Sequence, residues 1–323
     1  MPEEVSPLRK TPDCRDAEAV RVYLPARLRR ALAALDEVPG WEEIRLRAGR
    51  PLGIRAGEDF VLVSPAGEAG VSRGRALTVG REDLIRTISL MTGGSAYALE
   101  GEVAQGFLTL PGGHRVGVTG QVVVEDGRVQ RLIHPGGLNI RRGRELPGIA
   151  LPLLPDLRGE NRWHNTLIIS PPGCGKTTLL RDLVRIISDG SRARGIRGCR
   201  VGLVDERSEV AACHRGEPVF DVGTQTDVLD GCPKAQGMLM LLRSMGPDVL
   251  ATDELGRRAD AEAVREAVNA GVSVIATMHA ASASEVRRRP HVGQLVEEGA
   301  FARGVLLSRR RGPGTLEGVQ RLC

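Results

Sequence analysis

The stretch SPPGCGKTT, residues 170 to 178, has the residue types of a phosphate-binding loop. It follows the apolar run TLIIS and opens a helical pattern, and its glycines let backbone N–H groups converge on a phosphate at a helix N-terminus. Lys176 would reach the β and γ phosphates of a nucleoside triphosphate, and the Thr177 hydroxyl would hold a magnesium ion. Ser170 stands where the pattern G-x-x-x-x-G-K-[ST] has its first glycine, a departure that a strand end tolerates. The predicted nucleotide-binding residues are Pro172, Gly173, Cys174, Gly175, Lys176, Thr177 and Thr178.

Two acids follow another apolar run, DVLAT, further along the chain. Ligands of open α/β sheets bind at the carboxyl ends of the strands, so Asp253 and Glu254 would lie beside the phosphate loop. We expect Asp253 to join Thr177 in holding magnesium, and Glu254 to orient and deprotonate the attacking water.

Three further segments end in groups that suit the same chemistry. The strand pattern RVGLVDERSE lies between the two motifs along the chain, an insertion typical of NTPases that drive mechanical work. Glu206 or Glu209 would lie near the γ-phosphate, or else these acidic side chains would cap a following helix. VSVIATMHAAS ends in Thr277 and His279, which would sense the γ-phosphate, unless His279 is only a loop histidine.

An arginine near the acidic strand suits a different role. Arg243, in MLLRSMGPD, lies too close to that strand to reach its own nucleotide easily. It would act on a neighbour's γ-phosphate in a ring, or else be a solvated arginine at a helix end. The predicted catalytic residues are therefore Glu254, Lys176, Glu206, Arg243 and His279.

The elements that position these residues alternate along the second half of the chain. Four short apolar runs, TLIIS, RVGLVD, DVLAT and VSVIATM, are separated by helical patterns such as KTTLLRDLVRIISD and ADAEAVREAVNAG. This alternation predicts a parallel sheet buried on both faces. We expect residues 151–323 to form an α/β P-loop NTPase domain with a RecA/ASCE-like parallel sheet.

The first part of the chain has a different pattern. LPARLRRALAAL and REDLIRTISLM have helical spacing, and WEEIRLRAG alternates with Ile44 and Leu46 on one face. Turns rich in glycine break residues 102–142 into short apolar runs, which predicts hairpins. We predict a smaller α+β domain over residues 1–150, with the boundary near Pro147 and Pro152.

Composition narrows the class of protein. With 323 residues, 41% of them hydrophobic, the chain can bury two cores, and no apolar run approaches the roughly 18 residues of a membrane span. The polar, acidic N-terminus does not resemble a signal peptide, so we expect a cytosolic chain with reduced cysteines.

The net charge of +5 is diluted, since 45 basic residues face 40 acidic ones, and only Lys10, Lys176 and Lys234 are lysines. Such a balance is weak support for a nucleic-acid partner. The arginine runs at 287–289 and 309–311 are read as solvated faces, or as a contact for anionic lipid or a partner, and Gly312-Pro313-Gly314 as the turn of a terminal hairpin.

Taken in order, GCGKTTLLRDLVR, VGLVDERSEV and the stretch from MLLRSMGPD to TMHA resemble the stage III sporulation protein AA family of endospore-forming bacteria, within the wider class of type II and type IV secretion ATPases. EIRLRAGRPL, GFLTLPGGHRVGVTG and LNIRRGRELPG resemble the first domain of that family, so the resemblance covers about residues 40 to 310. Asp253-Glu254 stands where many secretion ATPases have Gly-Glu.

The resemblance implies ATP and Mg²⁺ as ligands and a hexamer. It implies a cytoplasmic protein, peripheral on the mother-cell side of a membrane, that docks on integral membrane components of a channel between mother cell and forespore. It also implies that Arg115, Arg141 or Arg142 contacts phosphates when the N-terminal domain swings over the nucleotide.

Two other hypotheses stay open at this point. A nucleic-acid-dependent ATPase would use the arginine-rich first domain, but only 2% of the chain is aromatic and Phe107 is the one aromatic residue of the glycine-rich hairpins. A scaffold that binds nucleotide without turnover is disfavoured by the intact set of Lys176, Thr177, Asp253 and Glu254. We therefore expect no nucleic-acid partner.

Overall fold

The computed structural model describes residues 14–94, 106–110, 113–125, 128–143, 145–160, 162–213 and 216–322. The chain divides into two compact units, Met1–Gly143 and Arg144–Cys323. This division falls seven residues before the boundary expected from the sequence, residue 150. The reason is that Ile149 and Ala150 pack against the core of the second unit, where the Ala150 N–H donates to Asp182 Oδ2 at 2.8 Å.

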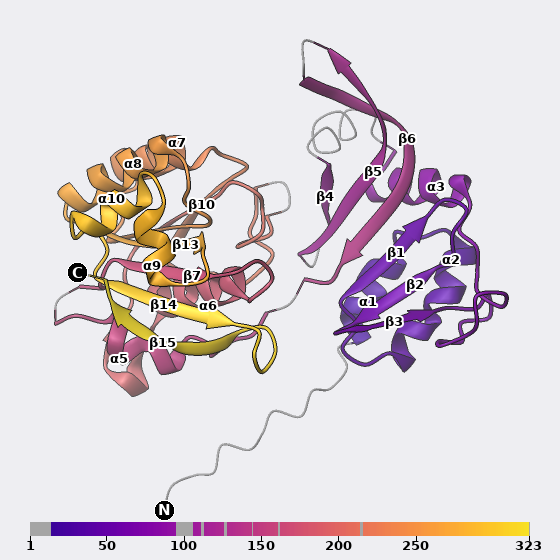
Figure 1. Cartoon of the computed structure of the whole chain (residues 1–323), viewed down its shortest axis with the longest axis horizontal. Helices are drawn as coiled ribbons and strands as arrows, with labels where there is room; N and C mark the ends of the chain where they lie inside the picture. The colour runs from indigo at the N-terminus through magenta and orange to yellow at the C-terminus, as the bar shows by residue number, and fades with distance from the viewer. Residues whose placement is uncertain are drawn as a thin grey trace, which may run out of the picture. The chain divides into compact units, whose positions relative to one another are not determined.

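The N-terminal unit is an α+β fold around one six-stranded sheet, ordered β3-β2-β1-β6-β5-β4, with every neighbouring pair antiparallel. Figure 1 shows this sheet with helices beside it. Its elements are α1 (Cys14–Arg21), α2 (Ala26–Ala31), the 3-10 helix η1 (Leu32–Glu37), β1 (Glu43–Arg47), β2 (Gly53–Ala56), β3 (Asp59–Leu62), α3 (Arg81–Met91), β4 (Phe107–Leu110), β5 (His114–Glu125) and β6 (Arg128–Arg141).

The sequence patterns of this unit map onto these elements with one difference. Ile44 and Leu46 are fully buried on one face of β1, as the alternation predicts. The helix expected over residues 24–35 begins after Pro25 and changes to a 3-10 helix at Leu32. Parts of the expected hairpins, at residues 102–105, 111–112 and 126–127, lie outside the described residues.

The C-terminal unit is built on a seven-stranded sheet ordered β11-β10-β12-β13-β7-β14-β15, parallel except for its last strand. Its strands are β7 (Thr166–Ser170), β10 (Val201–Asp205), β11 (Thr226–Asp230), β12 (Val249–Thr252), β13 (Ser273–His279), β14 (Arg303–Ser308) and β15 (Thr315–Arg321), and β8 (Gly190–Ser191) pairs with β9 (Ile196–Arg197) apart from it. Its helices are η3 (Leu151–Leu153), α5 (Leu154–Leu157), α6 (Lys176–Asp189), η4 (Arg192–Arg194), α7 (Lys234–Ser244), α8 (Arg258–Asn269), α9 (Ala283–Arg288) and α10 (Val292–Glu297).

Helices cover this sheet on both faces, which explains its unbroken apolar runs. Leu167 and Ile169 of β7 belong to the core beneath α7, α8, α9 and α10, whereas Ile168 between them belongs to the core beneath α6 (Figure 1). Successive residues of a strand point to opposite faces, so a strand buried on both faces must be apolar at every position. The fold is that of a P-loop NTPase, as the sequence predicts.

The strand between β7 and β12 in the sheet is β13, and not the strand that lies between their motifs along the chain. RVGLVD forms β10, which lies on the far side of β12, and β13 separates β12 from the phosphate-loop strand. Since β13 ends in His279, the histidine stands between the phosphate loop and the acidic strand.

No helix among the described residues combines the length and the apolar character that crossing a bilayer needs.

Candidate active site

The phosphate loop is shaped by two glycines in the left-handed region. Gly173 has a φ of 70°, and Gly175, the N-cap of α6, has a φ of 86°. A side chain at Gly175 would also begin 3.2 Å from the backbone of Gly314, whose N–H donates to the Cys174 carbonyl at 3.0 Å. The turn of the terminal hairpin therefore packs directly on the loop, and glycine at position 175 is required twice over.

Lys176 is buried at the start of α6 and is held within the loop itself. Its Nζ donates to the Ser170 carbonyl at 3.0 Å, to Ser170 Oγ at 3.1 Å and to the Pro171 carbonyl at 3.1 Å. Burial lowers the pKa of Lys176 from its ordinary value, and Cys174 and Glu254 oppose this. Ser170, the departure from the usual loop pattern, thus supplies an acceptor that a glycine would lack.

His279 connects this lysine to the acidic strand. Its Nδ1 lies 2.9 Å from Lys176 Nζ, and its Nε2 lies 3.6 Å from Glu254 Oε1. An ammonium group has no acceptor, so Nδ1 must accept this hydrogen bond and the ring proton sits on Nε2, toward Glu254. The three predicted catalytic residues Lys176, His279 and Glu254 therefore form one chain of contacts.

The backbone of Glu254 has a conformation that residues other than glycine rarely adopt. Its φ is 31°, its N–H donates to Thr277 Oγ1 at 2.8 Å, and its Oε2 accepts from Arg207 at 3.1 Å. Non-glycine residues in this region carry backbone strain that persists where the surroundings fix it, and such residues cluster at functional sites. Thr277 thus positions Glu254 through the backbone.

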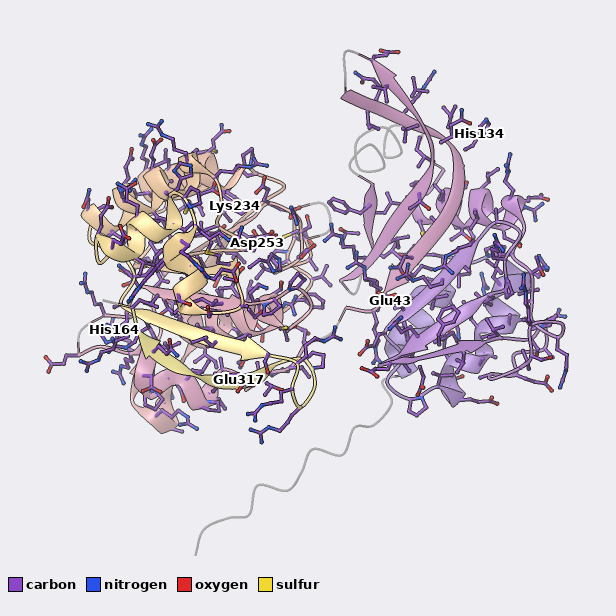
Figure 2. All side chains as sticks on the ribbon, in the orientation of Figure 1. Glu43, His134, His164, Lys234, Asp253 and Glu317 are labelled. Atoms are coloured by element: carbon purple, nitrogen blue, oxygen red, sulfur yellow. The ribbon has the colours of Figure 1, made fainter. Side chains whose placement is uncertain are left out.

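Asp253, one residue earlier, is 4% exposed and faces the side chain of Lys234. Lys234 Nζ lies 3.5 Å from Asp253 Oδ1 and donates to Glu206 Oε2. Figure 2 shows Lys234 and Asp253 side by side. Burial raises the pKa of Asp253, although the charge of Lys234 opposes the shift. Glu206, Asp253 and Lys234 form a compact cluster at the carboxyl ends of β10 and β12.

Asp205 organises the segment that carries Glu206. Its carboxylate accepts backbone N–H groups from Glu209 at 2.9 Å, from Val210 at 2.9 Å and from Ala211 at 2.8 Å. Burial raises the pKa of Asp205 to about 7, although the backbone donors Ala211 and Val210 oppose this. Among the described residues the next element after β10 is β11, so Asp205 caps a loop and not a helix, and the helix-capping alternative is wrong.

The arrangement fits a magnesium ion held together with phosphate oxygens. Asp253 Oδ1 is a buried carboxylate oxygen that accepts no hydrogen bond within the described residues. Within the same residues, no cluster of three or more His, Cys, Asp or Glu side chains is arranged to hold a metal. Magnesium typically takes one or two protein oxygens plus substrate phosphates, which suits Thr177 and Asp253.

Arg243 and three arginines of the N-terminal unit are also predicted to contact phosphates. Arg243 is exposed near the end of α7, and its side chain contacts no partner in the part of the chain that the structure describes. In the N-terminal unit, Arg115 lies over the Phe107 ring at 4.1 Å and Arg142 over the Trp41 ring at 5.3 Å. Arg141 ends β6. Their contact with phosphates stays a prediction.

Sequence reasoning missed Lys234 and gave Arg207 no role. A signal was present for Lys234, because it is one of three lysines among 45 basic residues. Lys176 and Lys234 are the two lysines within the described residues, and both lie at this site.

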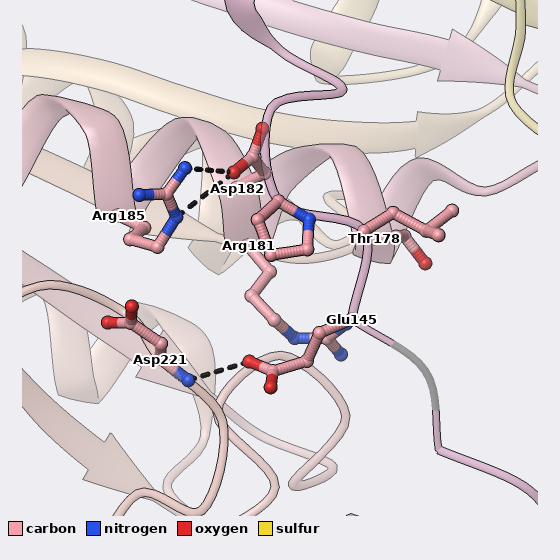
Figure 3. A pocket seen from close by; sticks show the side chains of 8 residues that line it. Glu145, Thr178, Arg181, Asp182, Arg185 and Asp221 are labelled. Carbon is pink, nitrogen blue, oxygen red and sulfur yellow. Dashed lines mark hydrogen bonds and ion pairs between the residues drawn. The ribbon is translucent and has the colours of Figure 1, made fainter. Parts of the chain in front are cut away.

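A pocket beside α6 is lined by Glu145, Leu146, Pro147, Thr178, Arg181, Asp182, Arg185 and Asp221 (Figure 3). The Asp221 N–H donates to Glu145 Oε1 at 2.8 Å, which fixes the chain entering this unit. Among the predicted site residues only Thr178 lines this pocket, so it is not the phosphate site.

The sequence of the whole chain has known relatives. The family model described as "Sporulation stage III, protein AA" matches residues 15–321. Stage III sporulation protein AA of Bacillus subtilis (strain 168) is 45% identical over 300 residues, which cover 92% of each chain.

Solved structures resemble the fold at low identity. The ATPase DotB of Legionella pneumophila has a TM-score of 0.52 at 15% identity, over 95% of this chain and 78% of its own. The pilus retraction motor PilT, solved with bound ADP, has a TM-score of 0.51 at 17% identity, over 84% of this chain and 75% of its own. At this level of identity, the two structures show that this chain has a similar fold and nothing further.

Proposed function

Because the chain belongs to the stage III sporulation protein AA family, we propose that it is a magnesium-dependent ATPase of the secretion type that acts in sporulation. The observation that carries the proposal is the chain of contacts from Lys176 through His279 to Glu254, beside the buried carboxylate of Asp253. A phosphate-binding lysine and a carboxylate joined by one imidazole suit hydrolysis of the bond to a γ-phosphate.

Lys176 changes partners when nucleotide binds. Its acceptors are carbonyls of the loop, the Ser170 hydroxyl and His279, and the β and γ phosphates of ATP are stronger acceptors for an ammonium group. Release of His279 Nδ1 from Lys176 frees the ring to respond to the phosphate. Magnesium, held by Thr177 and Asp253, would neutralise charge that develops on the phosphates.

Glu254 acts as the base that orients and deprotonates water. Its Oε2 accepts a hydrogen bond from Arg207, its Oε1 lies 3.6 Å from His279 Nε2, and its backbone is held by Thr277. Glu206, on the adjacent strand end, is a second carboxylate toward the γ-phosphate. General base catalysis of this kind contributes about 10²- to 10⁴-fold to a rate.

We further propose that the working form is a homo-oligomeric ring, a hexamer, that docks on integral membrane components of a channel between mother cell and forespore. The exposed, partner-free guanidinium of Arg243 among the described residues supports a role in trans. In such a ring it would contact a neighbour's nucleotide. The pilus retraction motor PilT, which has a similar fold, was solved with bound ADP, and this supports nucleotide binding by the present chain.

The test is ATP turnover of the purified chain over a concentration series, with mass followed by light scattering. We expect turnover to rise as the ring forms. Glu254→Gln should lower turnover about 10²- to 10⁴-fold. Arg243→Ala should lower it about 10³-fold or more while nucleotide affinity changes little. Arg288→Ala, another exposed arginine, is the matched control and should behave as wild type.

A monomer whose turnover is indifferent to Arg243 would contradict the ring. An oligomer without turnover that still binds ATP would favour the scaffold hypothesis. Stimulation by single-stranded nucleic acid that declines with salt would favour the nucleic-acid-dependent ATPase.

A further inference from the structure

Lys234 is a buried cation that the proposed mechanism does not use. It is the first residue of α7 and is 6% exposed. A helix N-terminus carries a partial positive charge, so an ammonium group is disfavoured in the first turn of a helix. Its position therefore needs a stabilising partner outside the helix.

The partners are the two acids at the ends of adjacent parallel strands. Lys234 donates to Glu206 Oε2, after β10, and lies 3.5 Å from Asp253 Oδ1, after β12. β10 and β12 pair in register, with Val204 opposite Thr252. The ammonium group thus joins the two strand ends directly beyond their last paired residues.

A lysine suits this position better than an arginine would. The ammonium is compact and can direct three donors at acceptors that converge from different elements, whereas a guanidinium is planar and suits side-by-side acceptors. In a chain whose basic residues are nearly all arginine, a buried lysine at this point indicates a specific geometric requirement.

Burying an ion pair gives little net stability, and a pair of apolar residues often serves a core as well. Lys234 Nζ also lies beside Asp253 Oδ1, at 3.5 Å. This oxygen accepts no hydrogen bond within the described residues. Without this cation, the buried carboxylate of Asp253 and the partly buried carboxylate of Glu206, whose side chain is 25% exposed, would attract a divalent metal. The role of the Lys234 ammonium is therefore to neutralise the charge of these two carboxylates, and not only to stabilise the core.

We propose that Lys234 is a positioning residue of the ATPase site. Its ammonium group fixes Glu206 beside Asp253 and keeps free divalent metal from the two carboxylates until a metal arrives with the triphosphate. This inference rests on the proposed ATPase function for its catalytic consequence, but its effect on metal binding is independent of turnover.

The experiment compares Lys234→Met with Arg257→Met in the full chain. Arg257 is the matched control, since its guanidinium lies 3.9 Å from Glu206 Oε1 but its side chain is 80% exposed. Lys234→Met should lower kcat about 10- to 100-fold and change KM for ATP by less than about threefold, because the lost interaction positions a catalytic carboxylate. Arg257→Met should change neither.

A second readout needs no turnover. Without nucleotide, Mn²⁺ binding followed by electron paramagnetic resonance should be at least about tenfold tighter for Lys234→Met than for wild type. Wild type and Arg257→Met should bind Mn²⁺ equally weakly. Lys234→Gln, which keeps a donor for Glu206, replaces Lys234→Met where the latter does not fold as judged by Trp163 fluorescence.

A double-mutant cycle tests whether Lys234 acts through Glu206. Lys234→Met combined with Glu206→Gln should be no slower than the slower single variant. Additive losses would overturn the positioning role, as would a wild-type kcat in Lys234→Met. Absence of turnover in wild type would refute the proposed ATPase, whereas unchanged Mn²⁺ binding in Lys234→Met would refute this inference alone.

Discussion

The two units bury apolar side chains in the same way, but they differ in the charges that they bury. In the N-terminal unit, Asp83 is the one buried Asp, Glu, Lys or Arg among the described residues, and it caps α3 by accepting the Gly80 N–H. The described part of the C-terminal unit buries seven: Lys176, Arg181, Asp182, Asp205, Lys234, Asp253 and Asp260.

Four of these seven stand at the carboxyl edge of the parallel sheet: Lys176, Asp205, Lys234 and Asp253. Charges are costly to bury unless they are paired and hydrogen-bonded. An antiparallel sheet alternates its strand ends, whereas a parallel sheet brings the ends of β7, β13, β12 and β10 to one edge. The C-terminal unit therefore sacrifices some stability to concentrate charge at one edge of its sheet.

The two tryptophans allow this comparison to be tested unit by unit. Trp41 is buried in the N-terminal unit and Trp163 in the C-terminal unit. Variants that keep one tryptophan, with Phe in place of the other, report the unfolding of one unit at a time.

Lys176→Ala should give the largest effect. Loss of the ammonium group that reaches the phosphates should lower turnover by more than about 10³-fold and weaken nucleotide binding. Trp41 fluorescence should report unchanged unfolding of the N-terminal unit. The measurements are steady-state turnover, binding of a fluorescent nucleotide and urea unfolding.

Lys176→Arg is the control for that variant, because a guanidinium keeps the charge but cannot meet the converging acceptors Ser170, Pro171 and His279. It should be nearly as inactive. Turnover close to wild type in either variant would remove the basis for assigning catalysis to the buried charges.

Asp205→Asn should alter how the stability of the C-terminal unit depends on pH. Because burial raises the pKa of Asp205 to about 7, the folded state binds this proton more tightly than the unfolded state does. Its contribution is therefore greatest below the ordinary pKa and declines as pH rises to 7. The free-energy difference between variant and wild type should move in favour of the variant by roughly 2 kcal/mol between pH 5 and pH 7.

Urea unfolding followed through Trp163 at both pH values measures this shift. The side-chain amide of the Asp205→Asn variant would offer an N–H₂ group where the backbone N–H of Glu209 now donates, so the variant should be less stable than wild type at pH 5. A wild type whose pH dependence equals that of the variant would show that the buried acid does not titrate in this range.

The positions of these charges could be predicted better than their partners. The strand and helix patterns placed Asp253, Glu254 and His279 at strand ends, and β7 and α6 have the expected bounds. The contact of His279 with Lys176 was not predictable, because the order of strands in a sheet is set by packing across the sheet and not by the order of motifs. Lys234 was missed for a similar reason, since a lysine at the start of a helix is usually solvated.

Arg27→Ala tests whether buried charge in the N-terminal unit is purely structural. Arg27 pairs with Asp83 Oδ2 at 2.7 Å and donates to the Thr78 carbonyl at 2.9 Å, with its side chain 53% exposed. Its loss should reduce the stability of the N-terminal unit by about 1 kcal/mol, as seen by Trp41, and leave Trp163 unfolding unchanged. The same loss seen by Trp163 would contradict the independence of the two cores.

Arg200→Ala should have the smallest effect on stability. It tests whether a charge in the C-terminal unit has a large effect only when it is buried. Arg200 and Asp248 form a two-pronged ion pair in the C-terminal unit, at 2.9 and 3.2 Å, but just before β10 and β12 begin and with side chains 60% and 46% exposed. The Arg200 guanidinium holds the pKa of Asp248 below its ordinary value, so the pair stabilises above the ordinary pKa of aspartate and is lost as pH falls. Solvent screening keeps the contribution of this pair to stability small, and added salt should diminish it further. An effect of Arg200→Ala on turnover or stability as large as that of the variants in the buried cluster would contradict this expectation. Any charge in the C-terminal unit would then be equally important, whether or not it is buried at the carboxyl edge of the sheet.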